Sequence, residues 1–173
     1  MIRCVLAALL LAGCASAPDV PSHADLRATA VWLRFGDSIC SGTAVGPDLL
    51  VTAQHCGTLT HVRDTPVTAA VVEQGERDFV LYRITGVTFD HYAKRGDIPS
   101  QGDRVRWWGA PMGQVDIYRE GYVARVSDSE IAVSAPICRG DSGAGIFNDA
   151  GEVVGVVSAM VAPQHCQFAL SLP

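Results

Sequence analysis

The sequence predicts an all-β protein, and three features of the chain support this fold class. Apolar runs are short and rich in valine and isoleucine, turn residues separate them, and glycine is frequent, at 17 of 173 residues. The hydrophobic content of 49% is enough for a real core, and the length suits one domain or two half-domains that share an interface. The net charge of −5 argues against a nucleic-acid partner.

Residues 1–13 have the character of a signal peptide. A basic residue precedes an apolar run, 5–12, that is too short to span a bilayer as a helix. The run closes on Leu11-Ala12-Gly13-Cys14, which resembles the bacterial lipobox. The resemblance implies lipidation of Cys14 and anchoring to the bacterial cell envelope, facing the periplasm, and Ser16 favours the outer membrane. The alternative is an ordinary secretory leader cut after Ala15 or Ala17.

Residues 14–28 are expected to form a lipidated tether between membrane and domain. The stretch 15–24 holds two prolines, two serines and little that could pack. A β-prone run, 29–35, is the first expected strand. The folded part, 29–173, divides at a charged loop with glycine and proline into portions of about 29–90 and 101–173.

A β-hairpin with a possible disulfide is predicted in the first portion. Two β-prone runs, 40–45 and 49–56, flank a Gly-Pro-Asp turn. Their pairing places Cys40 opposite residues 54–56, so Cys40 and Cys56 come within disulfide range, in the oxidising compartment that the leader implies. Such a bridge would fix His55 at the end of a strand.

The segment 138–145, Cys-Arg-Gly-Asp-Ser-Gly-Ala-Gly, suits a nucleophile on a tight turn. Gly140 and Gly143 permit backbone conformations that expose Ser142 and turn N–H groups inward. The N–H groups of Gly140 and Ser142 are candidates to hold the oxyanion of an acyl-transfer intermediate. A serine hydroxyl needs a base, so this interpretation demands one elsewhere. The alternative is a glycine-rich turn with an idle serine.

Three segments together carry a family resemblance. Ser41-Gly42-Thr43, the run Leu50-Val51-Thr52-Ala53-Gln54-His55-Cys56 and Gly140-Asp141-Ser142-Gly143 resemble the histidine and serine motifs of chymotrypsin-like serine proteases. Gln54 and Ala144 depart from the usual residues, but neither removes a catalytic group. The resemblance implies two small antiparallel β-barrels, with the active site in the cleft between them, and peptide hydrolysis through an acyl-enzyme without a metal or organic cofactor. Gly102-Asp103-Arg104-Val105 and the final strand are similar to HtrA-type bacterial peptidase domains, here without a peptide-binding module.

The resemblance also implies a catalytic triad of His55, Asp78 and Ser142. Ser142 would attack, His55 would carry the proton, and Asp78, at the mouth of a β-prone run, would orient the imidazole. The competing carboxylates are in loop-like surroundings; they are Asp64, Asp90 and Asp97.

Substrate preference and a second disulfide follow from the same resemblance. The expected pocket is walled by two segments before and after the serine, with a third nearby; its named positions are Pro136, Ile137, Ser158, Met160, Phe168 and Ala169. Relatives that cut after basic residues carry an acid where this chain has Pro136, so cleavage after small or medium aliphatic residues is expected. Cys138 and Cys166 match a family bridge beside the pocket. Zinc held by cysteines and His165 is a weaker alternative, because the spacing is not that of a metal finger.

Digestive relatives pair the aspartate before the serine with a newly cut amino terminus. This chain has no such cleavage sequence before its first strand, so we expect Asp141 to have another partner and activity to need no cleavage. Arg139 is a candidate by proximity alone.

Two other functions are alternatives to a protease that acts on polypeptide substrates. The first is a catalytically silent lipoprotein that uses the protease fold as a binding module; a binder needs none of the three catalytic side chains, which argues against it. The second is an esterase-like hydrolase, whose usual α/β fold requires helices between strands, and the sequence predicts none.

Overall fold

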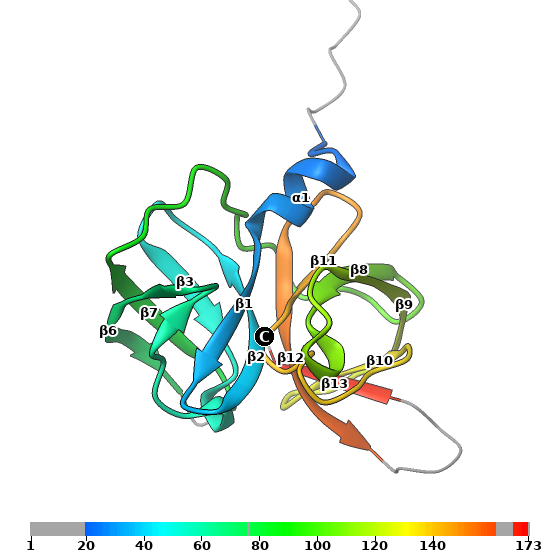
Figure 1. Cartoon of the computed structure of the whole chain (residues 1–173). Helices are drawn as coiled ribbons and strands as arrows, with labels where there is room; N and C mark the ends of the chain where they lie inside the picture. Colours follow the sequence, from blue (N-terminus) through cyan, green and yellow to red (C-terminus); the bar gives the residue numbers. More distant parts are fainter. Residues whose placement is uncertain (1–19, 76, 162–167, 173) are drawn as a thin grey trace, which may run out of the picture.

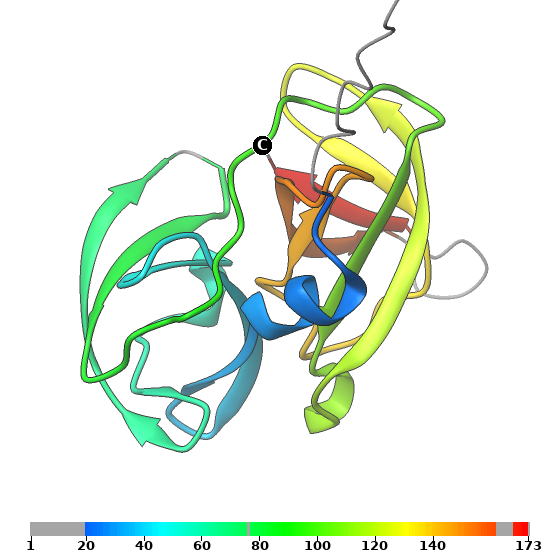
Figure 2. The same ribbon diagram turned by 90° about the horizontal axis from the view of Figure 1, so that it is seen from above.

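The computed structural model describes residues 20–75, 77–161 and 168–172. Two curled antiparallel sheets lie side by side, and a short helix, α1 (His23–Thr29), covers their junction (Figures 1 and 2). None of the helices in the described part of the chain is long and apolar enough to cross a membrane. The all-β double-barrel prediction is confirmed, with the first sheet curled and the second closed.

The first sheet contains seven strands in the order β5-β4-β1-β2-β3-β7-β6. Their bounds are β1 Ala30–Phe35, β2 Ser38–Ala44, β3 Leu49–Thr52, β4 His61–Val62, β5 Thr65–Pro66, β6 Thr68–Gln74 and β7 Val80–Thr85. The predicted hairpin is β2–β3, with Ala44 opposite Leu50. A 3-10 turn, η1 (Gln54–Cys56), directly follows β3.

The second sheet closes into a barrel in the order β10-β13-β12-β11-β8-β9. Its elements are β8 Arg104–Gly109, the 3-10 turn η2 Pro111–Gly113, β9 Ile117–Val126, β10 Ile131–Ser134, β11 Gly145–Phe147, β12 Val153–Val161 and β13 Phe168–Leu172. The loop that precedes β11 carries Ser142, so β10 and β11 fix both ends of the loop that contains this serine.

Each sheet encloses its own apolar core, and a third cluster joins the two. Leu33 and Leu50 are fully buried in the first core. The adjacent tryptophans of β8 point to opposite sides: Trp107 enters the second core, whereas Trp108 lies in the cluster between the sheets with Phe147. The relative position of the two halves, and therefore of the groups that they contribute to the cleft, depends on this third cluster.

Residues 23–28 are not part of a tether, contrary to the prediction from composition. They belong to α1, which begins at a capping box in which the Ser22 hydroxyl accepts from the Asp25 N–H and the Asp25 carboxylate accepts from the Ser22 N–H. Leu26, only 1% exposed, packs beside Trp108 and Phe147. Its burial at the junction of the sheets is the physical reason why this segment folds back on the domain.

Candidate active site

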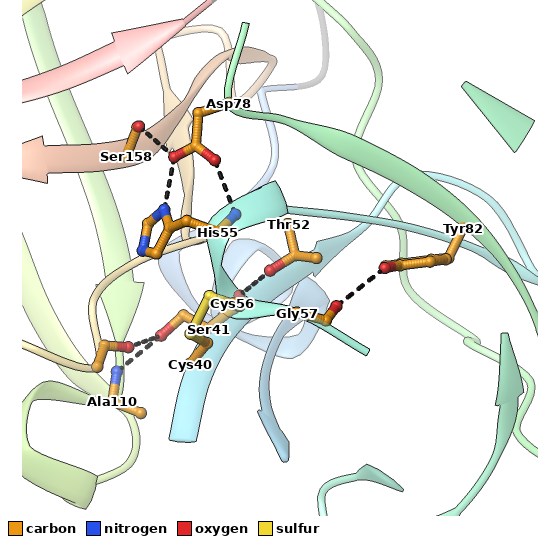
Figure 3. Close-up of a disulfide and its surroundings, with 11 residues drawn as sticks. Cys40, Ser41, Thr52, His55, Cys56, Gly57, Asp78, Tyr82, Ala110 and Ser158 are labelled. Carbon is orange, nitrogen blue, oxygen red and sulfur yellow. Dashed lines mark hydrogen bonds and ion pairs between the residues drawn. A yellow bond between two sulfur atoms is a disulfide. The ribbon is translucent and has the colours of Figure 1, made fainter. Parts of the chain in front are cut away.

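His55 is fixed to the first sheet by a covalent bond one residue away. It lies on η1, and the next residue, Cys56, forms the predicted disulfide with Cys40 of β2, with a Cα–Cα distance of 6.5 Å (Figure 3). The hydroxyl of Tyr82 on β7 donates to the carbonyl of Gly57 at 3.2 Å. The turn that carries His55 is therefore held to β2 on one side and β7 on the other.

Asp78 is the carboxylate that meets His55. Its Oδ2 lies 2.5 Å from Nδ1 of His55, and its Oδ1 accepts the His55 backbone N–H at 2.8 Å. Ser158, on β12 of the second barrel, donates its hydroxyl to the same Oδ2 at 2.5 Å (Figure 3). A carboxylate with three donors is fixed in orientation, and the third of these links the two halves of the molecule.

This contact determines the tautomer of His55. An ionised carboxylate only accepts hydrogen bonds, so Nδ1 of His55 carries a proton and donates a hydrogen bond to Asp78. The neutral ring then leaves the lone pair of Nε2 free to accept a proton. The imidazole is about half exposed at the cleft, whereas the Asp78 carboxylate is 27% exposed.

The competing carboxylates lie elsewhere. Asp64, Asp90 and Asp97 are all exposed. Asp64 lies in the turn between β4 and β5, and its carboxylate is 3.9 Å from Arg34. Among the described residues only Asp78 accepts a hydrogen bond from His55.

The turn before β11 requires glycine at two positions. Gly140 and Gly143 have φ angles of +99° and +89°, which strain other residues. A Cβ on Gly140 would lie 2.1 Å from the carbonyl oxygen of Ala110. A Cβ on Gly143 would lie 2.1 Å from both the Ser41 carbonyl oxygen and the Thr52 hydroxyl. The turn thus fits between η2 and the first sheet only because both side chains are missing.

Ser41 of β2 fastens this turn to the first sheet. Its N–H donates to the carbonyl of Ser142 at 2.7 Å, and its hydroxyl donates to the carbonyl of Gly140 at 2.7 Å. The same hydroxyl accepts the Ala110 N–H at 2.9 Å (Figure 3). Ser41 is 1% exposed, so these bonds are shielded from water.

These contacts tie the turn of Ser142 and the turn of His55 to the same strand, β2. The carbonyl of Ser142 accepts a hydrogen bond from the N–H of Ser41. The residue before Ser41 is Cys40, and its disulfide partner Cys56 directly follows His55. The position of a Cβ on Gly143 is also 2.9 Å from the N of Ala53, two residues before His55. Ser142 itself is half-buried at the cleft.

Two N–H groups of the turn have no hydrogen-bond acceptor among the described residues. The N–H groups of Asp141 and Gly143 donate to the carbonyls of Cys138 and Val157. Within the described residues, those of Gly140 and Ser142 donate to no acceptor. They are the two N–H groups that the sequence predicts to bind an oxyanion.

Asp141, which directly precedes Ser142, is completely buried. Its Oδ2 accepts the Cys138 N–H at 2.9 Å and lies 3.8 Å from Nε of Arg119 on β9. Burial raises the pKa of this carboxyl, while the Cys138 N–H and the Arg119 charge act in the opposite direction. The charged neighbour is therefore Arg119 and not Arg139, which is exposed. Only the alternation along β9, which puts Arg119 on the same face as Gly121 and Val123, hints at this from sequence.

The expected pocket positions have different surroundings. Ile137 packs in the second core at 6% exposure. Pro136 is exposed and lines a hollow of about 430 Å³ with Arg104, Glu120 and Tyr122 on the outer face of the barrel. These two side chains consequently do not share one pocket, because consecutive residues of an extended segment point to opposite sides.

The remaining pocket positions belong to β12 and β13. Ser158 bonds to Asp78, which commits its hydroxyl to the acid–base pair. Met160 is paired with Ala169, and Phe168 lies one position along in the same strand pair. Cys138 is exposed and has no disulfide partner among the described residues; Cys166 and His165 lie outside them, so the predicted second disulfide stays a prediction. In the part of the chain that the structure describes, no cluster of three His, Cys, Asp or Glu side chains suits a metal.

Comparison with known proteins gives a family and a fold. A family model described as trypsin-like peptidase domain matches residues 40–156. No curated protein matches the chain by sequence. The active form of the Rv3671c protease from M. tuberculosis superposes with a TM-score of 0.73 at 18% identity, over 86% of this chain and 77% of that one. An inactive form of Rv3671c gives a TM-score of 0.71 at 19% identity, over 86% and 85%.

The matched range includes the disulfide of η1, the carboxylate that meets His55 and the glycine-bounded turn of Ser142. It spans well over half of the chain, and the structural likeness extends the same fold over most of the remainder. The chain therefore belongs to the family of trypsin-like peptidases.

Proposed function

We propose that this protein is a serine endopeptidase in which His55, Asp78 and Ser142 form the catalytic triad. The observation that carries the proposal is the His55–Asp78 contact of 2.5 Å beside a turn that Ser41 ties to the same sheet. A catalytically silent binding module needs neither the fixed tautomer nor the open N–H groups.

The chemistry follows from the protonation state of His55. Nε2 of His55 accepts the Ser142 hydroxyl proton as the oxygen attacks the scissile carbonyl carbon. The resulting oxyanion is held by the N–H groups of Gly140 and Ser142. The imidazolium, stabilised by Asp78, then gives its proton to the amine that leaves. Water repeats the sequence on the acyl-enzyme and releases Ser142.

Labelling with a fluorophosphonate probe tests this assignment. The probe forms a covalent bond only with an activated serine, so we expect labelling of the wild-type domain and none of Ser142→Ala. His55→Ala should also prevent labelling, because the hydroxyl then lacks its base. Labelling of the Ser142→Ala variant would show that another residue is the nucleophile.

We further propose cleavage after small or medium aliphatic residues. No acidic residue occurs in 136–138, 158–160 or 168–169, and the nearby Asp141 is buried and engaged with Cys138. A basic side chain at the cleaved position would have no counter-charge, and burial of an unpaired charge is costly. Profiling with a mixed peptide library tests this preference, and a dominant basic residue would contradict it.

The location of the protein is a separate proposal. We propose that Cys14 is lipidated and anchors the domain to the bacterial envelope, facing the periplasm, on the basis of the lipobox-like sequence. Cys14→Ser should move the full chain from the detergent phase to the aqueous phase on partitioning. Unchanged partitioning would contradict lipidation at this residue.

A further inference from the structure

The nucleophile turn contains a buried charge whose partner comes from a distant strand. Asp141 has no exposed surface, and its Oδ1 has no hydrogen-bond donor among the described residues. That oxygen faces the bare Cα of Gly109: a Cβ there would lie 2.0 Å away. A carboxylate in such surroundings loses hydration and needs a compensating charge.

Arg119 is placed to supply this charge. It is directly opposite the fully buried Trp107 in the β8–β9 pair, so its stem runs along the inner side of the barrel. Its Nε is 3.8 Å from Oδ2 of Asp141, and this Nε is buried without a hydrogen-bond acceptor in the described part of the chain. Two charged groups, each with an unpartnered buried atom, thus face one another.

The position of Asp141 controls the two neighbours that the proposed mechanism uses. Its Oδ2 accepts the Cys138 N–H, and its own N–H donates to the Cys138 carbonyl at 3.1 Å, which closes the turn around Gly140. Ser142 is the next residue in the chain. Rotation of the Asp141 carboxylate out of its site would therefore displace the N–H groups of Gly140 and Ser142 together.

We infer that Arg119 is a positioning residue that holds Asp141, and through it the N–H groups of Gly140 and Ser142, in the geometry that receives an oxyanion. This inference rests on the proposed function. Arg119 does not touch substrate: it acts through Asp141. Because Arg119 supplies a positive charge from inside the barrel, the turn does not need a newly cut amino terminus to pair with Asp141. The domain should therefore be active with residues attached before α1.

The test compares Arg119→Met with Arg125→Met. Arg125 is on the same strand, but it is exposed and paired with Glu130 at the surface. We expect Arg119→Met to lower kcat at least tenfold with KM changed less than threefold, because loss of oxyanion donors acts on the transition state. Arg125→Met should stay within twofold of wild type. Arg119→Lys, which retains the charge, should recover part of kcat.

Amide hydrogen exchange provides a readout that does not need activity. The N–H groups of Cys138, Asp141 and Gly143 should exchange at least tenfold faster in Arg119→Met than in Arg125→Met. If the wild type failed to label with a fluorophosphonate, the proposed function would fail, and this comparison would still decide the role of Arg119. Equal exchange in the two variants would overturn the inference, as would a rise in KM with kcat unchanged.

Removal of both charges offers a second route if Arg119→Met does not fold. The double variant Arg119→Met with Asp141→Asn leaves no unpaired charge, and asparagine can still accept the Cys138 N–H. We expect this double variant to fold and to have a higher kcat than Arg119→Met. If Arg119→Met is insoluble, the double variant should have a higher kcat than Arg119→Lys. Losses that simply multiply would show that the two residues act independently.

Discussion

The two halves of the molecule fix the residues proposed for catalysis in different ways. In the first sheet, His55 is one residue from a disulfide, and Asp78 is held by three hydrogen bonds. In the second barrel, where the predicted Cys138–Cys166 disulfide reaches outside the described residues, the turn of Ser142 has no disulfide to any described residue. It is held by Ser41, by the missing side chains of two glycines and by a buried charge.

This difference indicates which changes each half tolerates. A side chain held by several bonds loses part of its restraint when one bond is removed. A turn held by close contact is displaced by a single added methyl group, because close-packed interiors relax only in part. We therefore expect the loss of one restraining bond in the first half to be milder than the addition of a side chain in the turn of the second.

The largest effect should come from the proposed nucleophile and its proposed base. Ser142→Ala and His55→Ala should each lower kcat by on the order of a thousandfold or more, and the double variant should be no worse than either, because the pair acts as a unit. Steady-state kinetics on a peptide substrate measures this. Losses that multiply in the double variant would mean that the two residues serve separate steps.

The next effect tests the steric fit of the nucleophile turn. Gly143→Ala places a Cβ 2.1 Å from Ser41 and Thr52 at a positive φ, so we expect loss of activity by more than about a hundredfold and destabilisation of about 3 kcal/mol or more. Gly36→Ala is the control, since Gly36 has φ +60° but open space around it, and only about 1–2 kcal/mol of strain is expected. Equal effects in the two variants would exclude steric fit as the cause.

The covalent anchor of the first half should matter less for activity than for stability. Replacement of both Cys40 and Cys56 by serine should lower the free energy of unfolding by about 3 kcal/mol, as expected for a separation of 16 residues. Because Asp78 still bonds to the backbone and ring of His55, kcat should fall less than in Gly143→Ala. Urea unfolding and kinetics on the same preparation measure both quantities, and a larger loss of kcat than in Gly143→Ala would reverse the comparison.

Sequence reasoning succeeds where function depends on neighbours in the chain. The register of β2–β3 gives the Cys40–Cys56 disulfide, and the double glycine around Ser142 indicates a tight turn with free N–H groups. Helix α1 is missed although its capping box is visible in the sequence, because the prolines and serines of 15–24 suggest a tether. The sequence does not predict that Leu26 is a core residue, because its packing partners Trp108 and Phe147 are distant in the chain.

Pairing between distant elements is what sequence reasoning does not supply. Arg119 precedes Asp141 by 22 residues, and the alternation along β9 predicts only which face of the strand Arg119 lies on, not that closure of the barrel makes it a neighbour of Asp141. Arg139, two residues before Asp141, is exposed instead. Likewise, Ser158 is assigned to a pocket wall by resemblance, whereas its hydroxyl joins Asp78 across the two halves.

That hydrogen bond allows a smaller and sharper test. Ser158→Ala removes one of three donors to Asp78, so we expect kcat to fall about tenfold, which corresponds to roughly 1.4 kcal/mol. Ser127→Ala is the matched control, because its hydroxyl bonds only within an exposed turn. If both variants retained wild-type kcat, the link between the halves through Asp78 would have no role in catalysis.

The smallest effect concerns two aspartates with opposite responses to pH. Burial raises the pKa of Asp141, whereas the Ser22 hydroxyl and backbone lower the pKa of Asp25 at the start of α1. Where the folded pKa is raised, the folded protein binds more protons than the unfolded chain between the two pKa values. The contribution of Asp141 to stability is then full below the unfolded pKa and is lost as pH rises through the folded one.

The contribution of Asp25 has the opposite sign: it is present above the unfolded pKa and is lost as pH falls through the folded pKa. Relative to wild type, Asp141→Asn should gain stability as pH rises from acid to neutral, and Asp25→Asn should lose it. Urea unfolding of both variants over that range, in a Ser142→Ala background that prevents self-digestion, measures the two slopes. Slopes of the same sign would mean that the Asp141 carboxylate is stabilised in its ionised form by more than it loses on burial, and that the buried turn and the exposed helix are held by charge in the same way.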